Sequence, residues 1–319
     1  MIAAAIAVAM LQLPTATAQQ TTPRRIAFVS WFTESRGAAD LVEFRTGLRE
    51  LGHVEGRGVR IEAHFMDGDR RRTRKLLAAL EKTKVDVIFV RATPAAHIAK
   101  EVVHTVPVVM IVSDAIATGL AKSLSQPGAN MTGLAMVGPD IAGKRMQLLR
   151  ELMPGIRRVA FLGSARDPNT KTFAEALRLA AERIGVSLNV VLLEGPGAIT
   201  DSVFRSMRSD GVEAVIVQPI FTGSYKRIVE LAGPHRLAVT SDYEVFARAG
   251  GLFTYGADDI AMTRRAAYYV DRILKGARPA ELPIELPTRF RFVINLKTAS
   301  ALGLTIPPAV LIRADEVIE

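Results

Sequence analysis

The 319-residue sequence contains no cysteine, and this absence narrows the chemistry open to the chain. Disulfide bonds, thiol nucleophiles and cysteine-ligated metals are all excluded. Aromatic residues are scarce, at 6% of the chain, and tryptophan occurs once, at Trp31. The position of this tryptophan is informative, because such a large ring contributes strongly to cores and binding sites.

Catalytic motifs are also missing. Ser164 follows Gly163 but lacks the second glycine of a nucleophile elbow. The glycine pairs that begin at Gly56 and Gly195 lack the third glycine of a dinucleotide-binding loop, and there is no P-loop. The five histidines show no metal-ligand spacing. The sequence therefore lacks the set of catalytic residues that a hydrolase or an isomerase needs. We expect no enzymatic activity, no cofactor and no metal.

The net charge of +9 is spread along the chain instead of being gathered in one segment. One basic run, Arg70-Arg71-Arg72 with Arg74 and Lys75, opens a predicted helix. A solvated helix face explains this run better than an acidic partner does. No helix-turn-helix pattern precedes Ile26, as a repressor would require. The sequence therefore predicts no nucleic-acid partner.

The first eighteen residues differ in composition from the rest. The stretch from Ile2 to Leu13 is apolar and uncharged, and Ala16-Thr17-Ala18 matches the A-x-A pattern of signal-peptidase cleavage. The run is too short to cross a bilayer. No Lys or Arg precedes it, which a start codon assigned too late would explain. We expect a signal peptide at 1–18, a mature protein that begins near Gln19, and a periplasmic location.

The remaining sequence alternates short apolar runs with amphipathic segments, which is typical of an α/β protein. The first series has expected strands at 26–30, 59–65, 85–90, 106–112 and 131–136, and the second at 159–163, 188–193, 214–218 and 237–240. A late strand at 251–255 and a helix at 258–274 follow. This pattern predicts two Rossmann-like lobes with parallel sheets, joined by a multi-strand hinge. Lobe 1 would comprise 26–137 and 256–282, and lobe 2 would comprise 138–255 and 283–319.

Ligands of open parallel sheets bind beyond the carboxyl ends of the strands. The candidate residues at these ends are Ser30, Trp31, Thr93, Pro94, Ser113, Asp114, Arg166, Asn169, Gln218, Phe221, Asp242 and Tyr243. Trp31 is predicted to cover a ligand because its loop is polar, with a place in the core as the alternative. Thr93 and the amides after Pro94 open a helix, and they are predicted to take a carboxylate in addition to capping. Asp242 with Tyr243 would face an ammonium group, unless Asp242 only caps the next helix.

Several segments together resemble one family over the whole predicted mature chain. They are Leu48–Gly56, Val85–Ile88, Thr93–Ala96, Gly119–Gly133, Gly143–Leu149, Gly250–Gly256 and the C-terminal run from Tyr269. They are similar to segments of ABC transporter solute-binding proteins related to the tryptophan/tyrosine-binding type. The resemblance implies a type I periplasmic binding fold, no enzymatic activity, and delivery of a small-molecule solute to an ABC permease in the inner membrane. Characterised relatives bind aromatic amino acids, and we expect a monomer.

The departures from the family pattern fall in the predicted cleft. Ser30-Trp31 replaces Ser-Pro, Ser113-Asp114-Ala115 replaces Gly-Asp-Pro, and the segment from Ser164 to Asn169 replaces Asn-Pro-x-Asn-Pro. Arg91 stands where a small residue is usual. We expect a small carboxylate-bearing solute, an aromatic amino acid or a related acid, and Arg166 or Arg91 would favour a more acidic one. A sensory ligand-binding domain that signals to a membrane receptor is the alternative.

Overall fold

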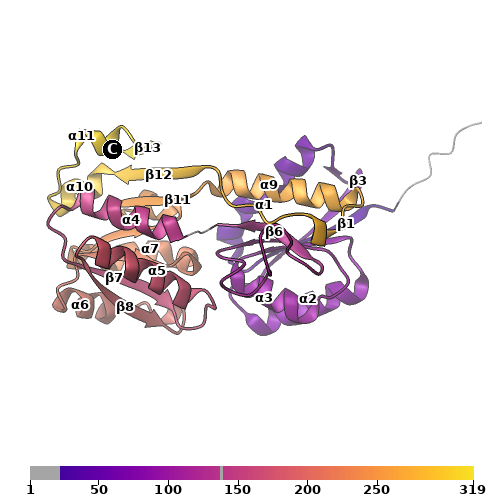
Figure 1. Cartoon of the computed structure of the whole chain (residues 1–319), viewed down its shortest axis with the longest axis horizontal. Helices are drawn as coiled ribbons and strands as arrows, with labels where there is room; N and C mark the ends of the chain where they lie inside the picture. The colour runs from indigo at the N-terminus through magenta and orange to yellow at the C-terminus, as the bar shows by residue number, and fades with distance from the viewer. Residues whose placement is uncertain (1–21, 137–138) are drawn as a thin grey trace, which may run out of the picture.

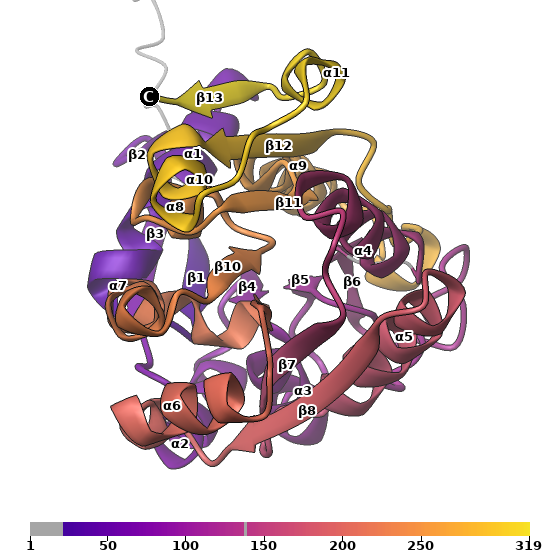
Figure 2. The same ribbon diagram turned by 90° about the vertical axis from the view of Figure 1, so that its left-hand side faces the viewer.

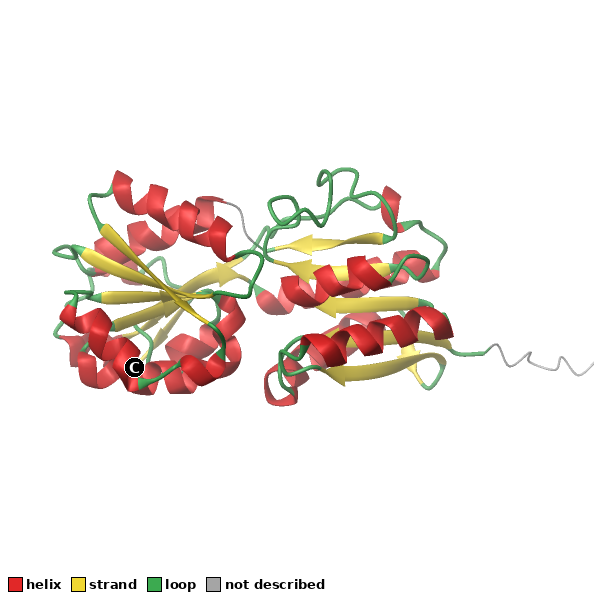
Figure 3. Ribbon diagram, turned by 90° about the horizontal axis from the view of Figure 1, so that it is seen from below, coloured by secondary structure: helices red, strands yellow, loops and turns green. Residues whose placement is uncertain are grey.

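The computed structural model describes residues 22–136 and 139–319, so the predicted signal peptide lies outside the described residues. Two lobes lie side by side along the long axis, and each is built on one sheet (Figure 1). Helices cover both faces of each sheet (Figure 3). The predicted α/β class is confirmed. Within the described residues, no helix has both the length and the apolar character that a bilayer crossing requires.

Lobe 1 contains a six-stranded sheet in the order β2-β3-β1-β4-β5-β6, with parallel pairings throughout. Its strands are β1 (Arg24–Ser30), β2 (Val54–Glu55), β3 (Gly58–Phe65), β4 (Val87–Arg91), β5 (Val108–Val112) and β6 (Met131–Ala135). Its helices are α1 (Glu34–Glu50), α2 (Arg70–Thr83), α3 (Thr93–Val102) and α9 (Asp259–Leu274). Ile26 and Phe28 of β1 pack with α1 and α9, whereas Ala27 and Val29 pack with α2 and α3. Burial on both faces explains the nearly continuous apolar strand sequences.

Lobe 2 contains a seven-stranded sheet in the order β13-β12-β11-β10-β9-β7-β8. Its strands are β7 (Arg158–Ser164), β8 (Ser187–Leu193), β9 (Ala214–Val217), β10 (Ala238–Ser241), β11 (Phe253–Ala257), β12 (Phe290–Asn295) and β13 (Glu316–Ile318). Its helices are α4 (Pro139–Leu152), α5 (Thr170–Arg183), α6 (Asp201–Ser209), α7 (Tyr225–Ala232), α8 (Glu244–Arg248), α10 (Leu296–Leu302) and α11 (Pro308–Leu311). Figure 2 shows α4 and α5 on one side of this sheet, and α6 and α7 on the other. Side chains of α4 and α5 pack with Phe161, and those of α6 and α7 with Leu162, so β7 also buries both its faces.

The chain passes between the lobes after β6, after β11 and before β12. Helix α9 follows a strand of lobe 2 but packs on lobe 1 beside α1. A Cβ atom added at Gly47 of α1 would lie 2.9 Å from the Ala267 side chain of α9, so glycine permits this close packing. Beyond α9, the Glu285 N–H donates to the Gly133 carbonyl of β6 at 3.1 Å. The segment that ends at Glu285 is thus still bound to lobe 1, and the described chain returns to lobe 2 only with β12.

Strand β12 was not predicted, and it runs antiparallel to β11. The cause lies in the path of the chain. Strand β11 leaves lobe 2 toward lobe 1, and β12 re-enters from that same side, with Ala257 and Phe290 paired at the point of passage. Because β12 enters lobe 2 at the same end of the sheet at which β11 leaves it, the two neighbouring strands must run in opposite directions. Strand β13 and the short helices α8, α10 and α11 were also not predicted.

Candidate functional site

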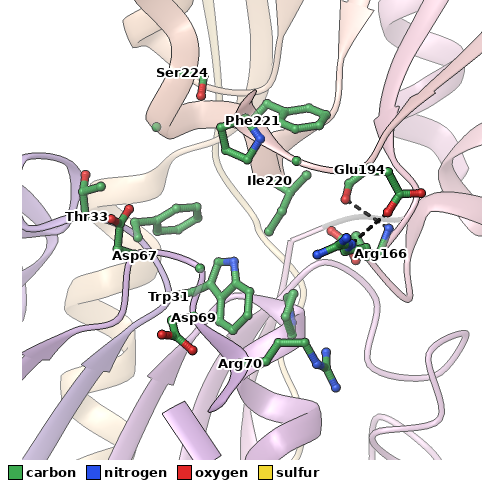
Figure 4. A pocket seen from close by; sticks show the side chains of 18 of the residues that line it. Trp31, Thr33, Asp67, Asp69, Arg70, Arg166, Glu194, Ile220, Phe221 and Ser224 are labelled. Atoms are coloured by element: carbon green, nitrogen blue, oxygen red, sulfur yellow. Dashed lines mark hydrogen bonds and ion pairs between the residues drawn. The ribbon is translucent and has the colours of Figure 1, made fainter. Parts of the chain in front are cut away.

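A cavity of about 460 Å³ lies between the two lobes. It is lined from lobe 1 by Trp31, Phe32, Thr33, Asp67, Gly68, Asp69, Arg70, Arg71 and Pro94, and from lobe 2 by Ser164, Arg166, Asp167, Glu194, Gly195, Pro196, Ile220, Phe221, Gly223 and Ser224 (Figure 4). These residues follow β1, β3 and β4 in lobe 1, and β7, β8 and β9 in lobe 2. The carboxyl ends of both parallel sheets therefore meet at this cavity, as expected for a ligand site in such folds.

Trp31 forms part of the lobe 1 wall. It directly follows β1, where its N–H donates to the Arg91 carbonyl at 3.3 Å and its carbonyl accepts from the Gly68 N–H at 2.8 Å. The side chain packs in the core under β1 and also lines the cavity, with 9% of its surface exposed. The ring is held by the core and also presented to the cavity, and its predicted contact with a ligand stays a prediction.

A smaller hollow of about 20 Å³ adjoins the cavity, and Phe32, Asp167 and Ile220 line both spaces. Its remaining lining residues are Arg91, Ala92, Thr93, Ile111, Val112, Ser113, Met136, Pro219 and Tyr243. The turn between β4 and α3 reaches this hollow, and Ala92 in that turn has a φ of 85°, a strained value for alanine. The first turn of α3, whose amide groups favour anions, therefore opens at the hollow.

Thr93 and Ser113 are held together at the rim of this hollow. The Thr93 hydroxyl oxygen accepts a hydrogen bond from the Ser113 N–H at 3.1 Å. Thr93 is buried and begins α3, with Pro94 in the first turn, a position where proline costs no hydrogen bond. Pro94 itself lines the larger cavity. The predicted carboxylate contact by these residues stays a prediction.

Asp167 lines both the cavity and the small hollow, and it is not among the predicted site residues. Its two oxygens each accept one hydrogen bond, from the Asn169 N–H at 2.9 Å and from the Gln218 amide nitrogen at 3.1 Å. Burial raises the pKa of the Asp167 carboxyl from its ordinary 3.8 to about 6, while the Asn169 N–H opposes this rise. Gln218 is buried and lines neither space, so its part is to orient Asp167.

Arg91 reaches the hollow, but its charge is already matched. Its guanidinium pairs with Asp40 at 2.8 Å and with Asp259, and the residue is 1% exposed. Arg36 binds the same two carboxylates, at 3.0 and 2.9 Å, and its guanidinium carbon lies 5.0 Å from the centre of the Tyr243 ring. Tyr243 belongs to lobe 2, so this contact joins the buried charge network of lobe 1 to the other lobe. A role for Arg91 in favouring an acidic solute therefore has little support from its surroundings.

Asp242 also has its own partner. Its carboxylate lies 2.7 Å from the Arg145 guanidinium, and both residues are buried. Burial raises the pKa of Asp242, and Arg145 opposes that rise. Asp242 lines a separate hollow of about 200 Å³ between the lobes and not the main cavity, whereas Tyr243 lines both this hollow and the small one. The ammonium contact that we expected for Asp242 is untested, and its geometry gives that contact no support.

The other predicted residues fall into two groups. Phe221 and Arg166 line the cavity, where Arg166 pairs with Glu194 at 2.8 Å at the open rim. Ser30, Asp114 and Asn169 line neither the cavity nor the small hollow. Ser30 accepts from the Phe32 N–H at 3.3 Å, and Asp114 accepts from the Ile116 and Ala117 N–H groups at 2.9 Å each. Both are turn-forming contacts.

Several lining residues were missed although a signal for them existed. Asp67, Asp69 and Arg70 follow the predicted strand at 59–65, and Glu194 follows the predicted strand at 188–193. The rule that ligands bind beyond the carboxyl ends of parallel strands (the strand-end rule) applies to these two strands as well. Phe32 and Asp167 lie next to the predicted site residues Trp31 and Arg166. The sequence therefore located the correct loops, but not these two side chains.

A family model described as "ABC transporter substrate binding protein" matches residues 31–318. The chain belongs to this family. A tyrosine-binding protein from Clostridioides difficile is 20% identical over 263 residues, which cover 82% of this chain and 75% of that protein. A crystal structure of an ABC domain from Streptococcus pneumoniae in complex with L-Trp is 26% identical, with a TM-score of 0.87 over 93% of this chain and 100% of that one.

A conserved domain protein from Vibrio cholerae has the same TM-score of 0.87 and the same coverage of both chains, with 23% identity. This substrate-binding protein therefore has the type I periplasmic binding fold that the resemblance implied. The match spans both lobes, so their arrangement is shared as well as their individual sheets. The loops around the cavity belong to a family whose described role is to bind a substrate of an ABC transporter.

Proposed function

We propose that this substrate-binding protein is the extracytoplasmic component of an ABC importer and has no enzymatic activity of its own. It is exported to the periplasm, acts as a monomer and passes its solute to a permease in the inner membrane. The solute is small and carries a carboxylate, as an aromatic amino acid or a related acid does. It binds between the lobes.

The observation that carries the proposal is the cavity built from the strand ends of both lobes. Its volume of about 460 Å³ lies within the range of small-molecule sites. Trp31, Phe32 and Phe221 give it an aromatic lining, which suits a flat apolar side chain. The first turn of α3 with Thr93 and Ser113 offers hydrogen-bond donors for a carboxylate at the adjoining hollow. The relatives named for tyrosine and L-Trp support the same class of solute.

Binding requires the lobes to move. The hollow at the start of α3 has a volume of about 20 Å³, close to that of one water molecule, so a carboxylate enters only when the lobes separate. The passages that join β6 to α4, β11 to α9 and Glu285 to β12 would act as the hinge. The TM-score is 0.87 with the L-Trp complex but 0.69 with a substrate-binding protein structure described as ligand-free and open, which supports a closed arrangement as the one described.

Thermal unfolding with added ligand tests the proposal. L-tryptophan, L-tyrosine and 3-(indol-3-yl)propionate are added separately, because a ligand at 100 times its Kd stabilises the folded state by about 2.7 kcal/mol. At least one should raise the unfolding temperature, and isothermal titration calorimetry should give one site per chain. Phe221→Ala should weaken this binding. Leu192→Ala, at an exposed apolar position on β8 away from the cavity, serves as the matched control. Failure of all three compounds to bind would refute the solute class.

A further inference from the structure

Asp167 lies where the cavity and the small hollow meet, and it is the one carboxylate among the described residues that lines both. No Lys, Arg or His nitrogen of the described residues lies within 4.0 Å of its oxygens, although the protein forms many ion pairs elsewhere. Its pKa is raised by burial, and no charged neighbour offsets that rise. A carboxylate held in this way lacks the counter-charge that buried acids normally have.

The surroundings of Asp167 are built for a carboxylate and not for an amide. The Gln218 side-chain oxygen accepts from the Ser164 N–H at 2.7 Å, a group that can only donate, so the Gln218 amide cannot turn over. Its nitrogen must therefore donate toward residue 167, while the Asn169 N–H donates to the other oxygen. An asparagine has one acceptor oxygen and could satisfy only one of these two donors. The aspartate is thus oriented, and its outer lone pairs remain free.

Two other carboxylates of the cavity are already engaged, and Asp67 lines the larger cavity but not the small hollow. Asp69 accepts from the Arg72 N–H at 3.0 Å as the cap of α2, and Glu194 pairs with Arg166 at the rim. Across the hollow from Asp167, lobe 1 presents the first turn of α3 with Thr93 and Ser113. One wall therefore offers donors and the other offers a negative charge. Such a pair of walls complements a head group that carries a carboxylate and an ammonium together.

We propose that Asp167 accepts the protonated amine of the solute, so that the solute is a zwitterionic aromatic α-amino acid and not a simple aromatic acid. The assignment rests on the proposed function. It places the α-carboxylate at the start of α3, the α-ammonium at Asp167, and the aromatic side chain in the larger cavity beside Trp31. It also replaces Asp242 as the ammonium acceptor, since Arg145 already neutralises Asp242.

The test compares amino acids with their deaminated analogues. L-tryptophan is paired with 3-(indol-3-yl)propionate and L-tyrosine with 3-(4-hydroxyphenyl)propionate, and Kd values are measured by calorimetry at pH 7.5. The parent protein should prefer the amino acid of a pair by about 10- to 100-fold. Asp167→Asn should remove most of that preference by weakening the amino acid and leaving the analogue within about threefold. Asp210→Asn, the same change at an exposed position of lobe 2, should leave both unchanged.

Each outcome decides the assignment. Equal weakening of both members of a pair in Asp167→Asn would mean that the residue only shapes the loop, and would overturn it. Asp167→Ser, which keeps an oxygen for the Asn169 N–H, repeats the test if the asparagine variant does not fold. A parent protein that binds both members equally overturns the assignment without any variant, while the proposed solute site stands. If none of the four compounds binds the parent protein, the proposed solute class fails together with the assignment.

Discussion

The pH dependence of stability gives the sharpest test of the state of Asp167 in the free protein. Its pKa is raised from 3.8 to about 6 in the folded chain. Between these values the folded state holds a proton that the unfolded state has released. Stability contributed by this group is therefore present at low pH and is lost as the pH rises from about 4 to about 6. Most acids behave in the opposite way, because ion pairs lower the pKa of their carboxyl groups.

The magnitude follows from the same two values. A shift of one pKa unit corresponds to about 1.36 kcal/mol, so a shift of roughly two units sets an upper limit near 3 kcal/mol. Asp167 borders the cavity and is not fully enclosed, which reduces the effect. We expect that the parent protein loses about 1–3 kcal/mol more than Asp167→Asn between pH 4 and pH 7. The lost hydrogen bond to Gln218 shifts the variant by a constant amount and leaves this difference intact.

Urea unfolding from pH 4 to pH 8, followed by far-UV circular dichroism and by the fluorescence of the single tryptophan, measures the difference. The comparison with the variant cancels other titrations, including those of Asp40 and Asp242, whose pKa values are also raised by burial. The other charged residues lining the cavity are carboxylates and arginines, and no histidine lines it among the described residues. Parallel curves for the parent and Asp167→Asn would refute the raised pKa.

Two further predictions concern the lobe 1 side of the site. Arg91→Met should lower the free energy of unfolding by about 3–5 kcal/mol, because Asp40 and Asp259 each lose a buried partner, whereas the exposed Arg24→Met should cost about 1 kcal/mol or less. Equal costs in urea unfolding would contradict the buried network. Trp31→Ala should weaken an aromatic solute about tenfold or more in calorimetry, and Trp31→Phe should restore part of the affinity. Unchanged affinity in the alanine variant would show that the ring serves the core alone.

The two-lobe plan could be predicted from the sequence because it depends on local patterns. Strands such as β4, with every residue from Val87 to Arg91 buried, read as short apolar runs, and the helices between them show their own spacing. The antiparallel β12 could not be predicted in this way. Its direction depends on where the chain re-enters lobe 2 after α9, and that path is set by packing between distant segments.

The strand-end rule located the loops of the site but could not rank the side chains within them. Asp242 and Asp167 both follow strand ends, and both are acidic. What separates them is a partner from elsewhere in the chain: Arg145 of α4 neutralises Asp242, while Gln218 after β9 orients Asp167 without neutralising it. Neither partner is close in sequence, so this distinction required the three-dimensional structure.

The same reasoning explains why an added arginine is a poor guide to the charge of the solute. Arg91 lies at the hollow, where the family resemblance led us to expect a small residue, and its sequence position alone suggests a site for a more acidic ligand. In the fold it brings in two carboxylates, Asp40 and Asp259, which leave no unmatched positive charge for a solute. Among the charged groups of the small hollow, Asp167 alone lacks a partner of opposite charge within the described chain. The small hollow therefore favours a head group that brings a positive charge beside the α3 donors.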